Sequence, residues 1–259
     1  MSSNASFPKQ WMVVMFNHII VYMSQVDAIR NMFTRHLKDD QTLEKKIETV
    51  KLTAEQSFGI RNEIAVADLA DLYHESACQD AVHSAAAVGA LAPLFESFFT
   101  NAFCEMGEYI ESNESLIQER KKYLQKNGSD CTWDCHFFLT NKKRKQKNVV
   151  LGIKQLIEAC GMGNFMPSQL NETLGALFAY RNNMFHWGFK WPQRIRDGFN
   201  KRLRNWPRGW FEQMSCDGKP EEFYMSKLFI DHCIETIDQV IGGFVEYAKC
   251  KTQEDQSKE

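Results

Sequence analysis

The chain has few residues that break helices: it contains six prolines and fourteen glycines in 259 residues. A fold rich in β-structure needs many turns, and proline and glycine are the residues that most often make them. No stretch shows the alternation of apolar and polar residues that half-buried strands require. These shortages exclude a many-turned β protein and favour long helices.

Long apolar runs are also missing. The most apolar stretch, Trp11 to Met23, covers thirteen residues and is interrupted by Asn17 and His18, whereas a membrane-spanning helix needs about 20 apolar residues. The first residues lack the basic start and the small-residue cleavage site of a signal peptide. The eight cysteines lie mostly in apolar, helix-like runs, as reduced core cysteines do. We therefore expect a soluble, cytoplasmic protein with no membrane partner.

The charges nearly cancel. Thirty-one basic and thirty-three acidic residues give a net charge of −2, and 44% of the residues are hydrophobic. This composition excludes wholesale disorder, because it can build a core. It also excludes a polycation, so any affinity for nucleic acid must come from local clusters of basic residues.

Apolar residues recur at helical spacing along most of the chain, which predicts an all-α fold with an antiparallel helical bundle. We divide it into an N-terminal helical region at residues 1–75, a main helical domain at 76–250 and a polar tail at 251–259. The main domain is expected to begin with a long buried helix, rich first in Ala and then in Phe. Its last helix is expected to begin near Glu221.

Several segments are expected to end helices. Residues 39–42 should break the first helix, and Ser57-Phe58-Gly59 should end the second. Gly161 and Gly188 stand where helix C-caps are expected. Between that last glycine and the closing helix, residues 188–220 contain glycine and proline at several positions, which predicts a loop.

The most informative segment is Tyr180-Arg-Asn-Asn-Met-Phe-His-Trp-Gly188, at the end of an otherwise apolar helix. Asn182 and His186 are four residues apart and share a helical face, and the long Arg181 side chain can reach toward them. Transesterification of an RNA phosphodiester needs an imidazole that moves a proton and a cation that neutralises the phosphate. The alternative is that Arg181 and His186 only cap the helix and bond a neighbouring carboxylate.

The pattern Arg-Asn-x3-His in the penultimate helix of an all-α chain resembles the motif of the HEPN superfamily of helical ribonucleases and nucleotide-binding proteins. Arg181, Asn182 and His186 match it one for one, and the resemblance covers residues 76–250. It implies a homodimer in which two motifs form one metal-independent endoribonuclease site. His186 would be the general acid/base, Arg181 the phosphate-stabilising cation, and Asn182 the residue that positions substrate or Arg181.

The resemblance leaves the biological role open. HEPN proteins act in phage defence, toxin–antitoxin pairs and stress responses, so a protein antitoxin or regulator is one expected kind of partner. Toxins paired with nucleotidyltransferase antitoxins carry Tyr two residues after the His; this chain has Gly188 there, which disfavours that branch. Some relatives keep the fold without cutting RNA. The alternative function is a non-catalytic module that binds RNA, a nucleotide or a protein.

A basic segment follows the motif directly. Residues 190–208 hold seven basic residues and a single acidic one, Asp197. Cations bind phosphates and flat rings stack on bases, so this composition predicts an RNA surface for single-stranded or structured RNA. The contacts are predicted from Lys190, Trp191, Arg194, Arg196, Lys201, Arg202, Arg204, Trp206 and Arg208. The alternative is a solvated loop whose Trp residues pack back on the helices.

The remaining candidates are weaker. Glu96, inside the long buried helix, could orient Arg181, or could equally face solvent. Cys131, Cys135 and His136 have the chemistry of zinc ligands, but no second Cys/His pair follows at a suitable spacing, so no metal is expected. There is no phosphate-binding glycine loop and no dinucleotide fingerprint, and we expect no cofactor. The basic run 142–147 is typical of a solvated linker, with a second RNA patch as its alternative.

Overall fold

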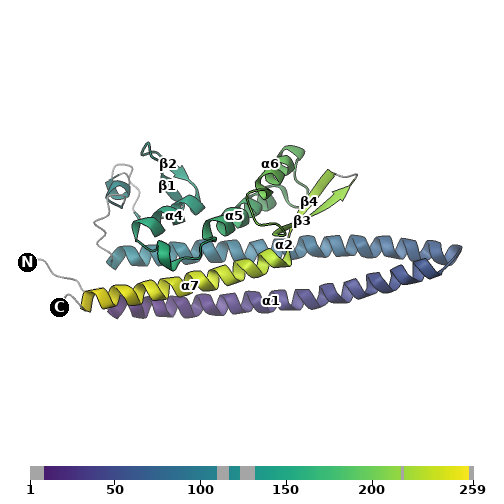
Figure 1. Cartoon of the computed structure of the whole chain (residues 1–259), viewed down its shortest axis with the longest axis horizontal. Helices are drawn as coiled ribbons and strands as arrows, with labels where there is room; N and C mark the ends of the chain where they lie inside the picture. The colour runs from purple at the N-terminus through teal and green to yellow at the C-terminus, as the bar shows by residue number, and fades with distance from the viewer. Residues whose placement is uncertain (1–8, 110–116, 123–131, 217–218, 257–259) are drawn as a thin grey trace, which may run out of the picture. The chain divides into compact units, whose positions relative to one another are not determined.

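The computed structural model describes residues 9–109, 117–122, 132–216 and 219–256, which are coloured in Figure 1. Its named helices are α1 (Lys9–Gln56), α2 (Ile60–Tyr109), α4 (Val149–Ala159), α5 (Leu170–Trp187), α6 (Gln193–Leu203) and α7 (Lys227–Gln256), with a short 3-10 turn at Gly163–Phe165. Two antiparallel hairpins accompany them: β1 (Phe137–Leu139) pairs with β2 (Lys145–Lys147), and β3 (Phe211–Cys216) with β4 (Lys219–Met225). The mostly helical chain confirms the predicted all-α character, whereas the hairpins were not predicted.

The chain forms two compact units, and each is assembled from distant stretches of sequence. Unit 1 comprises Met1–Val26, Leu91–Phe178 and Cys233–Glu259, and unit 2 comprises Asp27–Ala90 and Ala179–His232. The helices α1, α2, α5 and α7 each contribute one part to each unit. The boundary predicted between residues 75 and 76 lies inside α2.

Helix α1 is longer than predicted. It continues through residues 39–42, so the break expected there was wrong. Buried or half-buried positions recur every three or four residues along the helix: Ile19, Tyr22, Val26, Ile29, Phe33, His36, Asp40, Leu43, Ile47, Val50 and Ala54. This heptad spacing is typical of a helix that packs along a narrow seam. The polar residues 39, 41 and 42 lie on the opposite, exposed side, where they do not interrupt the helix.

The predicted break at residues 57–59 is confirmed, because α1 ends at Gln56 and α2 begins at Ile60. Gly59 adopts a φ of 60°, a left-handed conformation that favours glycine. Across the turn, the Asn62 side chain donates a hydrogen bond to the carbonyl of Ala54 at 2.6 Å. The two helices are thus tied together where they meet in unit 2.

Polar side chains occupy part of the seam between α1 and α2 in unit 2. Gln79 donates to the Asp40 carboxylate at 2.6 Å, and Nδ1 of His83 lies 3.3 Å from the same oxygen. The His83 ring stacks on His36 with the ring centroids 4.3 Å apart. Burial lowers the pKa of His83. A polar layer of this kind fixes the register of two helices at a cost in stability.

The Phe-rich part of α2 forms the core of unit 1. Phe95, Phe98, Phe99 and Phe103 are almost completely buried, as predicted for this helix. The Phe244 ring of α7 lies with its centroid 5.1–6.0 Å from the last three of them. This stretch also makes α2 long and apolar enough to cross a membrane by length and composition, although half of the most apolar window is buried inside the protein, as in a core helix.

The segment 188–220, predicted as a loop, contains α6 and most of the β3–β4 hairpin, so that prediction was wrong. Ile195, Phe199 and Leu203 recur every four residues and form the inward side of α6. The basic residues between them made this apolar pattern hard to recognise in the sequence. The last helix begins at Lys227 because residues 219–225 pair with β3. Gly188 does end α5, as predicted, with a φ of 64°.

Two adjacent glycines of α7 provide a matched test of packing in unit 1. A Cβ on Gly243 would lie 2.0 Å from the Phe165 carbonyl oxygen, whereas a Cβ on Gly242 would meet no atom within 4 Å. Gly243→Ala should lower the free energy of unfolding by roughly 1–3 kcal/mol because the backbone must move. Gly242→Ala should raise it by roughly 0.5–1 kcal/mol through helix propensity. Urea denaturation of both variants checks this; equal effects would contradict the close approach of α7 to Phe165.

Candidate functional site

An aromatic cluster in unit 2 holds the end of α5, α6 and the β3–β4 hairpin together; Figure 1 shows these elements in green beside one another. Phe199 of α6 is at its centre and is 2% exposed. Its ring centroid lies 5.0–6.2 Å from those of Tyr180, Trp191, Trp206, Phe211 and Phe223. Each aromatic pair contributes about 0.5–1.5 kcal/mol beyond the burial of its surface. The cluster therefore fixes the motif helix beside the basic helix within one unit.

Tyr180 anchors the motif to this cluster. Its hydroxyl donates to the Phe223 carbonyl at 3.0 Å, and burial raises the pKa of Tyr180. Close to it, the Ser84 hydroxyl accepts a hydrogen bond from the backbone N–H of Met225 at 2.8 Å. Because neighbouring residues of a helix point in different directions, an inward Tyr180 leaves the next residue, Arg181, at the edge of the core.

The three motif residues lie on the accessible side of the last turns of α5. Arg181 is half-buried, whereas Asn182 and His186 are exposed. The Arg181 guanidinium lies over the ring of Phe185, 5.8 Å from its centroid. At roughly 100° per residue, Asn182 and His186 are about 40° apart around the helix, and Arg181 lies about 140° from His186 with Phe185 between them. The motif thus forms one arc of cation, ring, amide and imidazole.

Sequence reasoning missed the exposed aromatic rings around the motif. Phe185, Trp187 and Phe189 are 64%, 49% and 37% exposed. Helical periodicity alone gave no reason to place them outside the core; their position among polar residues at a helix end was the available signal. Exposed rings beside cations can stack on unpaired bases or be covered by a partner.

Most of the predicted RNA-binding side chains lie at the surface of unit 2. Arg196 is half-buried and donates to the Gln193 side chain at 2.6 Å. Trp206 is half-buried, with its ring against Phe199. The exposed members of the set are Lys190, Arg194, Lys201, Arg202, Arg204 and Arg208.

Trp191 is the exception, and its prediction as an RNA contact is corrected. It is 3% exposed, its Nε1 donates to the Gly188 carbonyl at 2.8 Å, and its ring is stacked on Phe223. A ring buried to this degree has no face open to a base. For Trp191, the alternative of a tryptophan that packs against the protein interior is the correct one.

Glu96 lies in unit 1, where its carboxylate is 3.0 Å from Nε2 of His136. The other ring nitrogen of His136 lies 2.7 Å from Asp134. This imidazole, one of the zinc candidates, therefore has a carboxylate at both nitrogens. Burial raises the pKa of the Cys135 thiol to about 11, which disfavours the thiolate that a metal needs. The role of Glu96 in orienting Arg181 stays a prediction.

Metal ligands do not come together in the part of the chain that the structure describes: no group of three or more His, Cys, Asp or Glu side chains there could hold an ion. Cys131, the remaining zinc candidate, lies outside the described residues. No protein-family model, curated protein or solved structure matches this chain.

One carboxyl group of unit 2 has a strongly shifted pKa. Partial desolvation of its carboxyl group, together with the nearby carboxylates of Glu212, Asp40 and Glu44, raises the pKa of Asp80 from 3.8 to about 6. Tyr224, which donates a hydrogen bond to Glu222, also has a raised pKa, chiefly because of burial. The carboxyl groups of Asp80, Glu212 and Glu222 therefore place negative charge around the β3–β4 hairpin, whereas the protonated Tyr224 adds none.

Replacing Asp80 should make unit 2 more stable at neutral pH. Because the folded-state pKa of Asp80 is raised, its contribution to stability is complete below pH 4 and is lost as the pH rises through about 6. Asp80→Asn should therefore raise the melting temperature by about 1–3 °C at pH 8 and leave it unchanged at pH 4. Asp71→Asn, an exposed position on the same helix, is the control. A similar gain from both variants, or one independent of pH, would contradict the assignment.

Proposed function

We propose that the chain is a metal-independent endoribonuclease of the HEPN type that acts as a homodimer on RNA. The observation that supports this most is the aromatic cluster. Its ring contacts hold the polar end of α5 beside the basic helix α6. A site for phosphodiester cleavage needs both: groups that transfer protons and charges that hold the strand.

In the proposed reaction, the 2′-hydroxyl of a ribose attacks the adjacent phosphorus and the 5′-oxygen leaves, so that a cyclic phosphate remains. His186 moves a proton to or from one of these oxygens. Arg181 neutralises charge on the phosphate in the transition state, and Asn182 positions the substrate or Arg181. Within the described ranges the His186 imidazole has no hydrogen-bond partner, so it is open to an incoming ligand.

The number of proton transfers supports the proposal of a homodimer. The attacking hydroxyl must lose a proton and the leaving oxygen must gain one, which calls for a base and an acid. The motif offers one imidazole per chain, so two chains would supply the pair. The exposed rings of Phe185 and Trp187 beside the motif are apolar surface that a second motif helix would cover.

The basic helix would hold the strand outside the reacting groups. Arg194 and Lys201 are exposed, and helical geometry puts them opposite Phe199, the buried residue of α6. Arg202, Arg204 and Arg208 continue the cationic surface toward the hairpin. Phosphate contacts of this kind give affinity without sequence preference.

A non-catalytic module that binds RNA, a nucleotide or a protein is the second candidate. The exposed His186 favours it, because among the described side chains no carboxylate or carbonyl fixes its tautomer, as catalytic imidazoles usually require. In that case, the exposed rings around the motif would contact an antitoxin or another regulator.

The decisive experiment is cleavage of a single-stranded RNA by the full chain in EDTA, with analysis of the product ends. We expect products with 2′,3′-cyclic phosphate, and a loss of rate of about 100-fold or more in His186→Ala and Arg181→Ala. His74→Ala, an exposed histidine of α2, should cleave like the wild type.

Two outcomes would contradict the nuclease. Cleavage that disappears in EDTA but persists in His186→Ala would show that the motif is not the active site. Tight RNA binding without cleavage by the wild type, unchanged in His186→Ala, would instead identify the non-catalytic module.

A further inference from the structure

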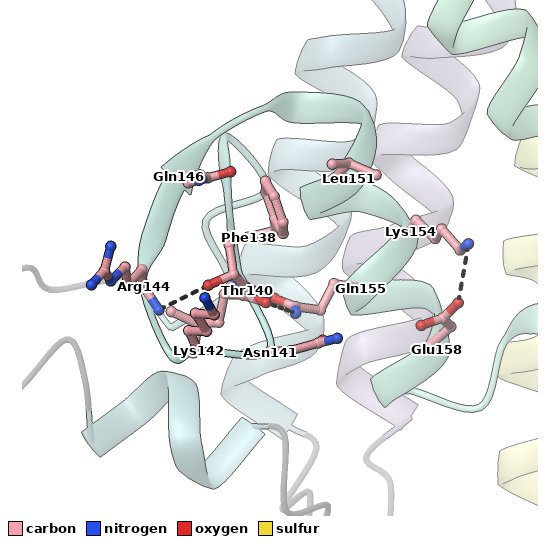
Figure 2. A pocket seen from close by; sticks show the side chains of 11 residues that line it. Phe138, Thr140, Asn141, Lys142, Arg144, Gln146, Leu151, Lys154, Gln155 and Glu158 are labelled. Carbon is pink, nitrogen blue, oxygen red and sulfur yellow. Dashed lines mark hydrogen bonds and ion pairs between the residues drawn. The ribbon is translucent and has the colours of Figure 1, made fainter.

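Unit 1, which does not contain the motif, has a groove between the β1–β2 hairpin and α4. The groove has a volume of about 760 Å³, within the range of small-molecule sites. Figure 2 shows Phe138 and Leu151 at one end of it, and the turn residues Asn141 and Lys142 at the other. It contains no residue of the proposed nuclease site.

A buried arginine holds together the two walls of the groove, the β1–β2 hairpin and α4. Arg120 is 0% exposed and donates hydrogen bonds at 2.6–3.2 Å to the carbonyls of Thr132, Asp134 and Phe137. It also donates to the Gln155 side chain of α4 at 2.8 Å. Gln155 in turn exchanges two hydrogen bonds of 3.0 Å with the backbone of Leu139 in β1. The hairpin and α4 are therefore fixed before any ligand arrives, which lowers the entropic cost of binding.

The turn of the hairpin supplies cations. Residues 142–147 include five basic residues and no acidic one. Lys143 pairs with Glu119 at 2.8 Å, and the Lys145 ammonium lies over the Phe137 ring, 4.4 Å from its centroid. Lys142 and Arg144 differ from these: both line the groove, and neither forms an ion pair with any described residue.

The turn has a lysine at a position where the backbone conformation favours glycine. Lys143 has a φ of 53°, the one positive φ of a non-glycine residue in the described chain. Glycine is the favoured residue at such a hairpin position, because a side chain there is strained. Strain that persists where glycine would remove it is a recurrent feature of ligand-binding loops.

Lys154 and Glu158, which also line the groove, pair with each other at 3.8 Å. Four further lining residues suit a planar ring with polar edges. Phe138 is half-buried and Leu151 is 39% exposed, so both present apolar surface to the groove. The amides of Asn141 and Gln146 also line it, and no side chain or backbone group in the described ranges bonds to either of them. Side-chain amides pair with the donor and acceptor edges of bases, and aromatic rings stack on their faces.

From this juxtaposition we propose that the groove binds a nucleoside phosphate, with the base against Phe138 and Leu151 and the phosphate at Lys142 and Arg144. A free nucleotide and a nucleotide within an RNA strand present the same chemistry. The proposal does not depend on nuclease activity and stands even if the motif is inactive.

The test is calorimetric titration of the full-length His186→Ala chain, which removes cleavage from the measurement. The ligands are AMP, ATP, inorganic phosphate and a ten-nucleotide single-stranded RNA. We expect saturable binding of the nucleotides and weaker binding of inorganic phosphate. The double variant Lys142→Gln/Arg144→Gln should lower the affinity about tenfold or more, because hydrogen bonds to charged groups are lost. Phe138→Leu should weaken nucleotide binding and leave phosphate binding unchanged.

Lys121→Gln/Lys147→Gln is the matched control, because it removes the same charge from exposed residues that do not line the groove. Its affinity for each ligand should be within about twofold of that of the His186→Ala chain if the contacts at the groove are specific. If the chain binds the RNA strand more tightly than AMP, and the double variant at Lys142 and Arg144 weakens this binding, the site is supported and assigned to RNA. If it binds AMP more tightly than the RNA strand, with the same loss in the double variant, the site is supported and assigned to a free nucleotide.

Three results would overturn the proposal. The first is no saturable binding of any ligand at millimolar concentration. The second is an equal loss in the groove variant and the control, which would indicate a non-specific charge effect. The third is inorganic phosphate that binds as tightly as AMP, which would leave no role for Phe138.

Discussion

The burial of Phe199 is the contact on which the candidate site depends. Helix α6 has eleven residues, and Phe199 is its buried one. A short helix with this many charges is not stable by itself in water, so its position follows from the packing of this ring against Tyr180, Trp191 and Phe223. Removal of a buried Phe side chain costs about 3–5 kcal/mol. The same contact that makes α6 a helix therefore also holds its cations beside the end of α5.

Polar bonds between distant segments complete this arrangement in unit 2. Ser84 of α2 bonds the backbone of Met225, and Tyr180 bonds the backbone of Phe223. The hairpin is thus fixed to α2 and to the motif helix by buried hydrogen bonds as well as by rings. Arg181 and His186 follow Tyr180 on the exposed side of a helix that cannot rotate without breaking these bonds, and the proposed chemistry requires such a fixed orientation.

Parts of the fold could be predicted because their signals are local. The breaks at residues 57–59 and Gly188 depend on glycine in a left-handed conformation, and the buried Phe residues of α2 depend on helical spacing. The continuity of α1 could not be predicted from the polar residues 39–42 alone. The apolar residues spaced by about 3.5 along the whole helix determine which side packs and which side faces solvent, and residues 39–42 follow that pattern. The three-residue strands β1 and β2 are too short to show alternation.

The candidate site was predictable only in part for the same reason. The position of Arg181, Asn182 and His186 at a helix end follows from Gly188. The burial of Trp191 does not follow from the sequence, because a tryptophan between cations suits an RNA surface and an aromatic core equally. Its contact with Phe223, thirty-two residues away, decides between them, and such long-range pairs leave no local pattern.

The central claim is that the end of α5 and the helix α6 form one RNA-binding surface. Hydrogen–deuterium exchange of the full-length His186→Ala chain, with and without saturating single-stranded RNA, tests it most directly, because cleavage is removed and every backbone amide reports separately. The account predicts slower exchange throughout residues 181–208 when RNA is bound, across both α5 and α6. Unchanged exchange in these residues, with RNA demonstrably bound, would contradict it.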